Sequence, residues 1–279
     1  MSPVLAIERL SAVTGDTALL RDVSLDVAAG EVHGLVGMSG AGKSMIAKAV
    51  LGVLPPAVRV TSGSIRFEGT EIAGLPRARM RQLLARGIAL IPQDPLSALN
   101  PTRRIDAQMT DVMRARLGLG AAAARERALA LLDEVQVREP ASVLRRYPHE
   151  ISGGQRQRIL IAIAFACAPR LIIADEPTTA LDVTVQKQIL RLIDDLRRRH
   201  GAAILFVTHD LGVVAKICDR ISVMHAGVIL EQGAVADVMA APQHPFTRAL
   251  FAATPRHDRP ELDLRPVPDA LQYAVSVPR

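Results

Sequence analysis

The sequence predicts an α/β protein with a parallel core sheet, an N-terminal antiparallel β subdomain, an inserted α-helical subdomain and a short C-terminal extension. Three observations support this fold class. Short strand patterns fill the first third of the chain, helical patterns rich in Ala, Arg and Leu follow, and apolar strands separated by a helical segment come last. At 279 residues the chain is long enough for one main domain with a large core.

The first third of the chain combines strand patterns with turn residues. The predicted strands are Val4–Leu10, Val23–Val27 and Val32–Val36, with turns at Gly15-Asp16 and Ala29-Gly30. A helix should begin near Lys43, after a glycine-rich turn, and end before Pro55. The order is therefore strand, loop, helix.

The middle of the chain, from about Asp94 to Ala168, predicts an inserted helical subdomain that includes a helix over Ala121–Val135. The sheet then resumes. Leu171–Ala174 and Ile204–Val207 are wholly apolar, and the segment between them, Val183–Arg199, has helical periodicity. That pattern is typical of buried parallel strands joined by a crossover helix.

The last part of the chain predicts a strand from Ile221, a turn at Ala226-Gly227, and short helices near Val235 and Phe246. We expect a main domain over residues 1–240 and a C-terminal extension over residues 241–279. Five prolines follow Thr254 and predict a loose tail.

Composition limits the class of protein. Apolar residues make up 49% of the chain and aromatic residues only 3%, so the core must consist mainly of Ala, Val, Leu and Ile. The apolar run Ile159–Ala168 is shorter than the roughly 20 residues of a membrane-spanning helix, and no secretory signal pattern is present. We therefore expect the protein to stay in the cytoplasm.

The cysteines and the charge balance point to no particular partner. Cys167 and Cys218 lack the spacing of a disulfide framework or a zinc site, so we expect buried, inert thiols. Lys and Arg number 34 against 28 Asp and Glu, and a basic surface attracts nucleic acid, anionic lipid or nucleotide phosphates. Charge alone does not choose among these.

The strongest motif is a phosphate-binding loop, GxxxxGKS, which runs from Gly37 to Ser44 between a predicted strand and a predicted helix. Glycines allow backbone N–H groups to face a phosphate, and the helix N-terminus adds positive potential. Lys43 would reach the terminal phosphates, and the Ser44 hydroxyl would bind Mg²⁺. The predicted loop ligands are Gly37, Ser39, Gly40, Gly42, Lys43 and Ser44.

Two carboxylates follow the apolar strand Leu171–Ala174. An acid at the C-terminal end of a buried parallel strand faces the crevice where such sheets bind ligands. Asp175 can hold Mg²⁺ there through its hydration shell, and Glu176 is placed to orient or deprotonate an attacking water. Alone, such a pair is more often a solvated strand end, but a phosphate loop upstream reverses that preference.

The segment Ile151-Ser152-Gly153-Gly154-Gln155 closely resembles the LSGGQ signature of ATP-binding cassette (ABC) proteins, with Ile in place of the usual Leu. Three further residues match family motifs in order. Gln93 matches the Q-loop, Asp182 the D-loop, and His209 the switch histidine. The resemblance covers residue 4 to about residue 253.

This resemblance implies a P-loop NTPase (RecA-like) core that binds ATP and Mg²⁺ and hydrolyses ATP. Glu176, His209 and Gln93 would be catalytic, and Ser44, Gln93 and Asp175 would bind the metal. Family members place ATP between two subunits. Ser152, Gly153 and Gly154, with Gln155 and Asp182 beside them, would therefore complete a nucleotide site at the boundary with a second ATPase subunit.

One departure from the family pattern concerns adenine. Family members usually stack the base on an aromatic residue near position 14, but no Phe, Tyr or Trp precedes Phe67 here. Base stacking on an aromatic ring is worth about 1–3 kcal/mol for nucleic-acid bases. We therefore expect weaker adenine affinity or looser base choice, unless another residue substitutes.

Within the family, three segments resemble the ATPases of dipeptide, oligopeptide and nickel importers. They are Gln93–Pro101, Tyr147–Glu150 and His244–Leu250. The resemblance implies a peripheral protein at the cytoplasmic side of the cell membrane, with two integral membrane permease subunits as partners. A solute-binding protein outside the cytoplasm would act indirectly, and the partner ATPase is a paralogue by analogy, with a homodimer left open.

Two other functions fit the sequence less well. A non-transport ABC ATPase acting on nucleic acid or the ribosome usually carries a long coiled coil before the signature, but Ser152 follows Lys43 by only 109 positions. We therefore expect no nucleic-acid partner. An inactive cassette that only binds nucleotide is disfavoured because Glu176 and His209 are both present.

Overall fold

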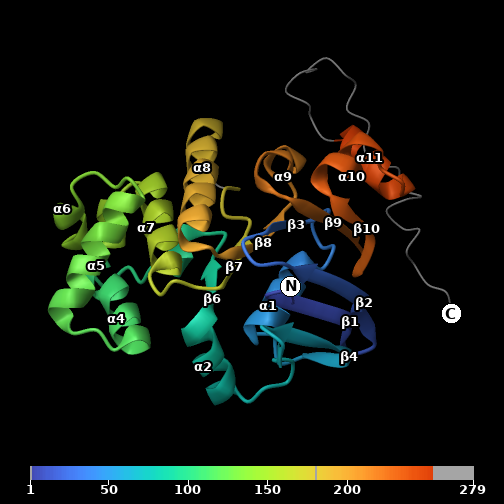
Figure 1. Cartoon of the computed structure of the whole chain (residues 1–279), viewed down its shortest axis with the longest axis horizontal. Coiled ribbons are helices and arrows are strands. Elements are labelled where there is room, and N and C mark those ends of the chain that lie inside the picture. The colour runs from blue at the N-terminus through green and yellow to red at the C-terminus, as the bar shows by residue number, and fades with distance from the viewer. Residues whose placement is uncertain (1, 180, 254–279) are drawn as a thin grey trace. The chain divides into compact units, whose positions relative to one another are not determined.

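The computed structural model describes residues 2–179 and 181–253 (Figure 1). The chain forms two compact units. Within the described residues, the first unit holds 2–76 and 205–253, and the second holds 77–179 and 181–204. The loose tail predicted after Thr254 lies outside the described residues. The predicted division into a main domain over 1–240 and an extension over 241–279 stays a prediction.

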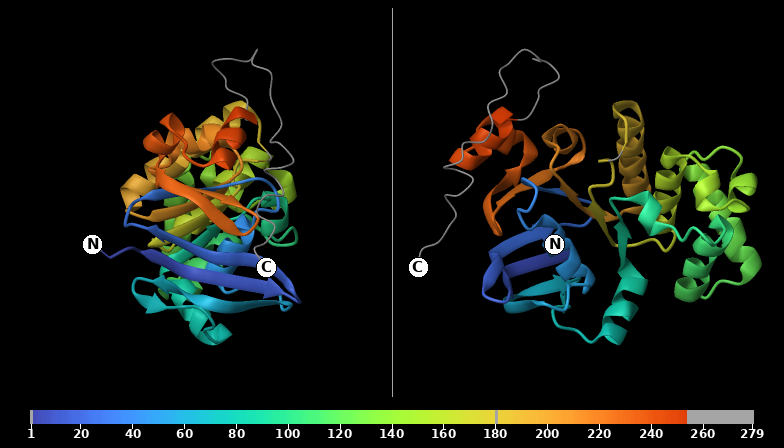
Figure 2. Two further views of the ribbon diagram at one scale, coloured as in Figure 1. Left: turned by 90° about the vertical axis from the view of Figure 1, so that its right-hand side faces the viewer. Right: turned by 180° about the vertical axis from the view of Figure 1, so that it is seen from behind.

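An antiparallel sheet opens the first unit, with strand order β2-β1-β4-β5 (Figure 2). The strands are β1 (Leu5–Thr14), β2 (Thr17–Val27), β4 (Val58–Phe67) and β5 (Thr70–Glu71). In β1, Leu5, Ile7, Leu10 and Ala12 are buried, so one face of the strand belongs to the core. The N-terminal antiparallel β region is thus present.

The strands β1 and β2 are longer than the sequence predicted. Both contain a residue with positive φ, Arg9 at 47° and Asp22 at 50°, where the pairing register shifts. The bulges allow the pairing to continue to Thr14 and Thr17, but they interrupt the two-residue alternation of buried side chains. The prediction was wrong about these ends because it depended on that alternation.

The first unit also carries the strand that leads into the phosphate loop. This strand, β3 (Val32–Val36), is wholly buried and pairs in parallel with β9 (Arg220–His225), which pairs antiparallel with β10 (Val228–Ala234). The strand order is β10-β9-β3-β8, and β8 (Ala203–Thr208) contributes its residues from Leu205 on. The predicted strand from Ile221 and the turn at Ala226-Gly227 are confirmed.

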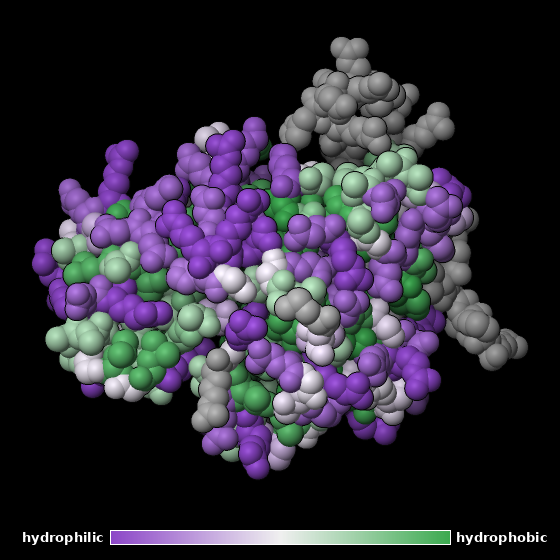
Figure 3. Space-filling view, viewed as in Figure 1, coloured by the Kyte–Doolittle hydropathy of each residue, from purple (hydrophilic) through white to green (hydrophobic). Residues whose placement is uncertain are grey.

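Four helices belong to this unit. They are α1 (Lys43–Leu51), α9 (Leu211–Ile217), α10 (Val235–Ala240) and α11 (Pro245–Ala253). The helices predicted near Lys43, Val235 and Phe246 are confirmed. Hydrophilic residues cover most of the face seen in Figure 3, although hydrophobic residues reach the surface over α10 and α11. Among the partly buried hydrophobic residues there are Met239, Ala249 and Leu250.

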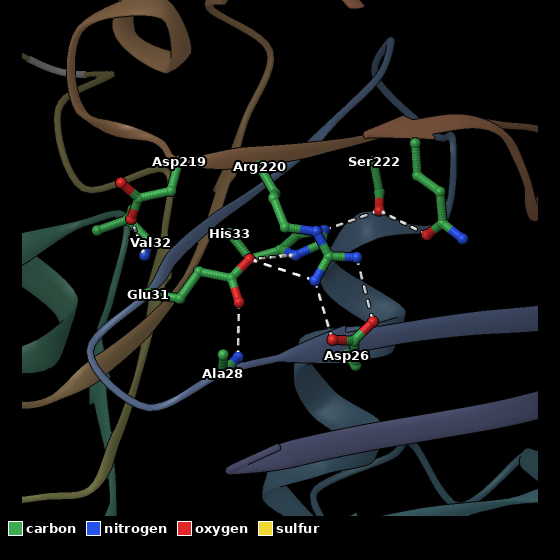
Figure 4. A network of polar contacts seen from close by, with 9 residues as sticks. Asp26, Ala28, Glu31, Val32, His33, Asp219, Arg220 and Ser222 are labelled. Carbon is green, nitrogen blue, oxygen red and sulfur yellow. Dashed lines mark hydrogen bonds and ion pairs between the residues drawn. The ribbon is translucent and has the colours of Figure 1, made fainter. Parts of the chain in front are cut away.

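A network of polar side chains ties β2, β3 and β9 together at their ends (Figure 4). Arg220 donates to both carboxylate oxygens of Asp26, at 2.9 and 3.2 Å. The buried His33 lies 3.2 Å from Glu31 through Nδ1 and 2.8 Å from the Ser222 hydroxyl through Nε2. Buried polar groups are costly unless they are hydrogen-bonded, so this network fixes the strand positions.

The network lowers the pKa of two carboxyls. For Asp26 the main cause is the hydrogen bond from Arg220. For Glu31 burial is the largest influence and acts to raise the pKa. Contacts with His33, the Ala28 N–H and Arg220 together outweigh it, and the pKa falls below its usual value of 4.5. Carboxyls with a depressed folded pKa stabilise the fold above their unfolded pKa, and this contribution is lost as the pH falls through the folded value.

We therefore expect Glu31→Gln to lower the melting temperature more at about pH 7 than at about pH 4, because the ionised carboxylate contributes less stability as it becomes protonated. Melting scans across this range would measure the gap between wild type and variant. The exposed Glu8 serves as the control, and Glu8→Gln should show a small gap at both pH values. A difference in melting temperature between wild type and Glu31→Gln that stayed constant with pH would contradict this account of the network.

The second unit pairs a short parallel sheet with a group of helices. Strands β6 (Ile88–Ile91) and β7 (Leu171–Asp175) are parallel. The helices are α2 (Arg77–Gly87), α3 (Pro95–Ala98), α4 (Ile105–Leu117), α5 (Ala121–Glu134), α6 (Pro140–Leu144), η1 (Pro148–Glu150), α7 (Gly153–Phe165) and α8 (Val183–His200). The helical character predicted from Asp94 to Ala168 is confirmed, and α5 agrees with the predicted helix to within one residue.

The expected core composition is also confirmed, because Ala, Val, Leu and Ile dominate the buried hydrophobic residues, although all five phenylalanines are buried too. Across residues 2–179 and 181–253, no helix is both long and apolar enough to cross a membrane. Cys167 and Cys218 are half-buried rather than buried, because each lies near a helix end. Burial still raises the pKa of both thiols, which disfavours the reactive thiolate.

Candidate nucleotide-binding site

The predicted phosphate loop lies between the end of β3 and the start of α1. Lys43 is 5% exposed, and its ammonium donates to the carbonyls of Gly37 and Met38 at 2.8 and 3.0 Å. Among the described residues no side chain caps α1, and its first turn carries no acidic residue. An uncapped helix N-terminus next to a lysine suits an anionic ligand.

Two positions of the loop require glycine, one because of close packing on β9 and the other because of its backbone conformation. A Cβ atom on Gly37 would lie 2.1 Å from the Met224 carbonyl oxygen. Gly42 has a φ of 106°, and a Cβ there would lie 2.8 Å from the Met224 side chain. A side chain at position 37 would push the loop away from the strand, and a side chain at position 42 would be strained at this left-handed φ. Ser39, Gly40 and Ser44, in contrast, are exposed.

His209 follows the end of β8, a strand that neighbours β3 in the sheet. Its side chain is exposed. The next residue, Asp210, caps α9 by accepting hydrogen bonds from the N–H groups of Gly212 and Val213 at 2.8 and 3.2 Å. This cap and the strand end hold the backbone of His209 from both sides.

In the second unit, Gln93 and Glu176 meet at the C-terminal ends of two parallel strands. Ile91 of β6 pairs with Ala174 of β7, and each site residue stands two positions further on. The Gln93 amide donates to the Glu176 carboxylate at 3.2 Å. Asp175 ends β7 and is half-buried beside them. Here the structure brings together three of the predicted site residues.

Glu176 adopts an unusual backbone conformation. Its φ is 47°, a left-handed value that typically costs a non-glycine residue about 1–3 kcal/mol. The Thr179 hydroxyl also donates to the carboxylate, at 3.0 Å, which places two donors on one oxygen atom. Strain of this kind concentrates at functional sites.

The signature segment forms the capped start of α7. The Ser152 hydroxyl accepts from the Gln155 N–H at 3.3 Å, and the Gln155 side chain accepts from the Ser152 N–H at 3.2 Å. Gly154 lies against Val185 of α8, because a Cβ there would be 3.5 Å from that side chain. A Cβ on Gly153, by contrast, would meet no atom of the described residues within 4 Å. Packing within the chain therefore does not explain why residue 153 is a glycine.

Asp182 has a structural role in the second unit. It caps the 18-residue helix α8 by accepting from the N–H groups of Thr184 and Val185 at 3.0 and 2.9 Å. This cap satisfies two backbone donors that the helix itself leaves without partners. Its predicted contact with nucleotide stays a prediction.

Sequence reasoning missed two residues that support Glu176. One is Thr179, described above. The other is Gln157, which is 1% exposed and donates to the Pro177 carbonyl at 2.8 Å. Gln157 thereby joins α7, the signature helix, to the turn that follows Glu176. The sequence signal for this link is the glutamine two positions after the signature segment, and its burial is seen in the structure.

The predicted magnesium ligands fit the chemistry of that ion. Ser44, Gln93 and Asp175 all offer oxygen atoms, which Mg²⁺ prefers. Within the described parts of the chain, no group of three or more His, Cys, Asp or Glu side chains could hold a metal by itself. Mg²⁺ that is bound through one or two protein groups plus substrate phosphates needs no such group.

Comparison with known proteins decides the family. A family model described as ABC transporter matches residues 20–179. The chain belongs to the ABC transporter family. A probable D,D-dipeptide transport ATP-binding protein of Escherichia coli is 44% identical over 281 residues, covering 99% of this chain and 86% of the relative. An oligopeptide transport ATP-binding protein of Salmonella typhimurium is 44% identical over 254 residues, covering 91% and 76%.

A solved structure has the same fold. It is a dimeric ATP-binding cassette in a post-hydrolysis state with ADP and Pi, at a TM-score of 0.73 and 24% identity over 83% of this chain and 98% of that one. The predicted fold class is confirmed, because the ABC ATPase fold joins an antiparallel sheet to a sheet rich in parallel strands. This ABC protein is an ATPase.

Proposed function

We propose that this ABC ATPase powers the import of peptides, working at the cytoplasmic side of the membrane as one half of an ATPase dimer bound to two permease subunits. Its dipeptide and oligopeptide transport relatives support peptides as the cargo. Nickel and metal chelates remain the alternative cargo. By analogy with such systems, the partner ATPase is a paralogue, and a separate solute-binding protein delivers the cargo to the permease.

ATP binds first through its phosphates. The Lys43 ammonium exchanges the carbonyls of Gly37 and Met38 for the terminal phosphates, and N–H groups of the loop and of α1 donate to the remaining oxygens. Ser44, Gln93 and Asp175 are the residues that would hold Mg²⁺, and the ion would supply positive charge to the phosphates.

Hydrolysis depends on Glu176. A water molecule attacks the γ-phosphorus and gives a proton to the Glu176 carboxylate, while the bond from the γ-phosphorus to the bridging oxygen breaks and ADP leaves. Gln93 and Thr179 hold the carboxylate by donating to one of its oxygens, so the other can face the water. His209, which is exposed, is the third catalytic residue that the family resemblance implies.

The second subunit completes the site through its signature segment, as this chain completes the partner's. Glycine weakens a helix relative to alanine by up to about 1 kcal/mol, and no packing within the described residues requires glycine at position 153. A phosphate that approaches the N–H groups of the first turn of α7 does require a residue without a side chain. The Ser152 hydroxyl and these N–H groups then bind the γ-phosphate held by the partner.

The observation that carries the transport function is the hydrogen bond from Gln93 to Glu176. Gln93 immediately precedes Asp94, the residue that caps α3. On α3, Leu96 is 64% exposed, so its apolar side chain is available for contact with a partner. A permease docked on Leu96 would therefore act on the Glu176 carboxylate through the short segment that leads from Leu96 back to Gln93.

The experiment is purification of the whole transporter in mild detergent. Two integral membrane subunits should be recovered with this chain, and Leu96→Asp should abolish the recovery because it places a charge in an apolar contact. Val53, 58% exposed in the other unit, provides the matched control, and Val53→Asp should leave recovery unchanged. Recovery without any membrane subunit, or equal recovery with both variants, would contradict the proposal.

A further inference from the structure

The hairpin of β9 and β10 contacts the phosphate loop near its tip. The Gly227 N–H at its tip donates to the Ala41 carbonyl at 2.9 Å, and Met224 packs directly against Gly37 and Gly42. Ala226 and Gly227 form a two-residue turn with φ values of 45° and 81°. The position of this tip therefore sets the position of the loop that holds the phosphates.

The same tip is fixed to β2. The Arg21 N–H donates to the Gly227 carbonyl at 2.8 Å, and the Arg21 guanidinium donates to the Ala226 carbonyl at 2.9 Å. Gly227 approaches β2 so closely that a Cβ atom would lie 2.4 Å from the Leu19 carbonyl oxygen. These contacts and the bond to Ala41 hold the tip between β2 and the phosphate loop.

On its other side, the hairpin is held by α11, the last helix of the described residues. The ring of Phe246 stacks on the ring of His225, with centroids 4.2 Å apart and planes 27° apart. His225 is the residue just before the turn. Both side chains are buried, at 1% exposure for Phe246 and 7% for His225. The stack therefore lies one residue away from the tip that contacts the loop.

The start of α11 has its own anchors. The Glu231 carboxylate on β10 accepts hydrogen bonds from the N–H groups of Gln243 and His244 at 2.7 and 3.0 Å. Phe246 donates its N–H to the His244 ring at 3.1 Å. These bonds fix Phe246 against the hairpin. Phe246 also belongs to the hydrophobic cluster that contains Val36, the last residue of β3, and Met38 of the loop packs against that cluster.

We propose that Phe246 is a positioning residue for ATP binding, which holds the β9–β10 hairpin against the phosphate loop through its stack on His225. This role rests on the proposed function of the phosphate loop as the ATP site. Phe246 touches no substrate. Its effect is to keep the Ala41 and Gly37 backbone in the arrangement that binds phosphate, so its loss weakens ATP binding more than it slows the chemical step.

Phe251 allows this role to be separated from ordinary core packing. It lies on the same helix and in the same hydrophobic cluster and is 8% exposed, but it does not stack on His225. Replacing either ring by leucine removes a similar volume from the same cluster. A purely structural role for Phe246 predicts the same effect for both variants, whereas a positioning role predicts a larger effect on ATP binding for Phe246 alone.

The test compares Phe246→Leu with Phe251→Leu in the full chain. Melting temperature, KM for ATP and kcat are measured for each. We expect Phe246→Leu to raise KM by about two- to tenfold, the range that an aromatic pair contributes, with kcat changed much less. Phe251→Leu should lower the melting temperature similarly and leave KM near the wild-type value. Phe246→Tyr keeps the ring and should also keep the wild-type KM.

A double-mutant cycle checks the path through His225. His225→Leu combined with Phe246→Leu should raise KM little beyond either single change, whereas His225→Leu combined with Phe251→Leu should be additive. Equal KM values for Phe246→Leu and Phe251→Leu would overturn the inference. Lys43→Ala, measured alongside, separates the two proposals: if it leaves nucleotide affinity unchanged, the proposed phosphate site itself is wrong.

Discussion

Replacing Glu176 by glutamine is expected to lower ATP turnover by at least about a hundredfold while ATP still binds. A positioned general base typically contributes about 10²–10⁴-fold to a rate, and glutamine has the same shape but cannot accept the proton of the attacking water. The amide can still contact Gln93 and Thr179, so the turn after β7 should keep its conformation. Steady-state ATPase rates and nucleotide binding measure the two effects.

The control for this change is Glu126, an exposed carboxylate on α5 in the same unit. Glu126→Gln should leave turnover within about twofold of wild type, since surface substitutions away from a site have small effects. If Glu176→Gln hydrolysed ATP at the wild-type rate, the assignment of Glu176 as the base would be wrong, even with the fold and family unchanged.

Lys43→Ala is expected to weaken ATP binding by about a hundredfold. A hydrogen bond to a charged group is worth about 1.5–3 kcal/mol, and Lys43 is placed to make more than one such bond to phosphate oxygens. Lys43 also bridges the carbonyls of Gly37 and Met38, so its loss should loosen the loop. Titration with a fluorescent ATP analogue in the presence of Mg²⁺ measures the affinity.

Lys48 provides the matched comparison, because it lies on the same helix in its last turn and is exposed. Lys48→Ala removes the same charge from the same helix without touching the loop, and ATP affinity should change little. Equal affinities for the two variants would mean that the general positive charge of the region, rather than the phosphate loop, holds the nucleotide.

The site motifs could be predicted from sequence because their chemistry is local. The phosphate loop needs only a strand, a glycine-rich turn and a helix start within a few residues, and the structure has all three in that order. The pairing of Gln93 with Glu176 follows from parallel strand register once β6 and β7 are neighbours. β6 itself was not predicted, because it begins at the residue after the end of α2 and no loop separates the two elements.

Contacts between distant segments could not be predicted. The bond from Gly227 to Ala41 and the stack of Phe246 on His225 depend on how β9, β10 and α11 pack, which no local pattern encodes. The residue that contacts adenine could not be predicted either. All five phenylalanines are buried, so none of them offers an exposed ring to the base, and the expected loss of adenine affinity stays a prediction.

The claim that ATP is held between two subunits is tested most directly by a structure of the complex trapped with ATP in the Glu176→Gln variant. The distance to measure joins the Ser152 hydroxyl oxygen of this chain to the γ-phosphate held by the partner ATPase. A hydrogen bond of about 3 Å is predicted, with the N–H groups at the start of α7 facing the same phosphate. A γ-phosphate contacted by residues of one subunit only, with Ser152 in solvent, would contradict the claim.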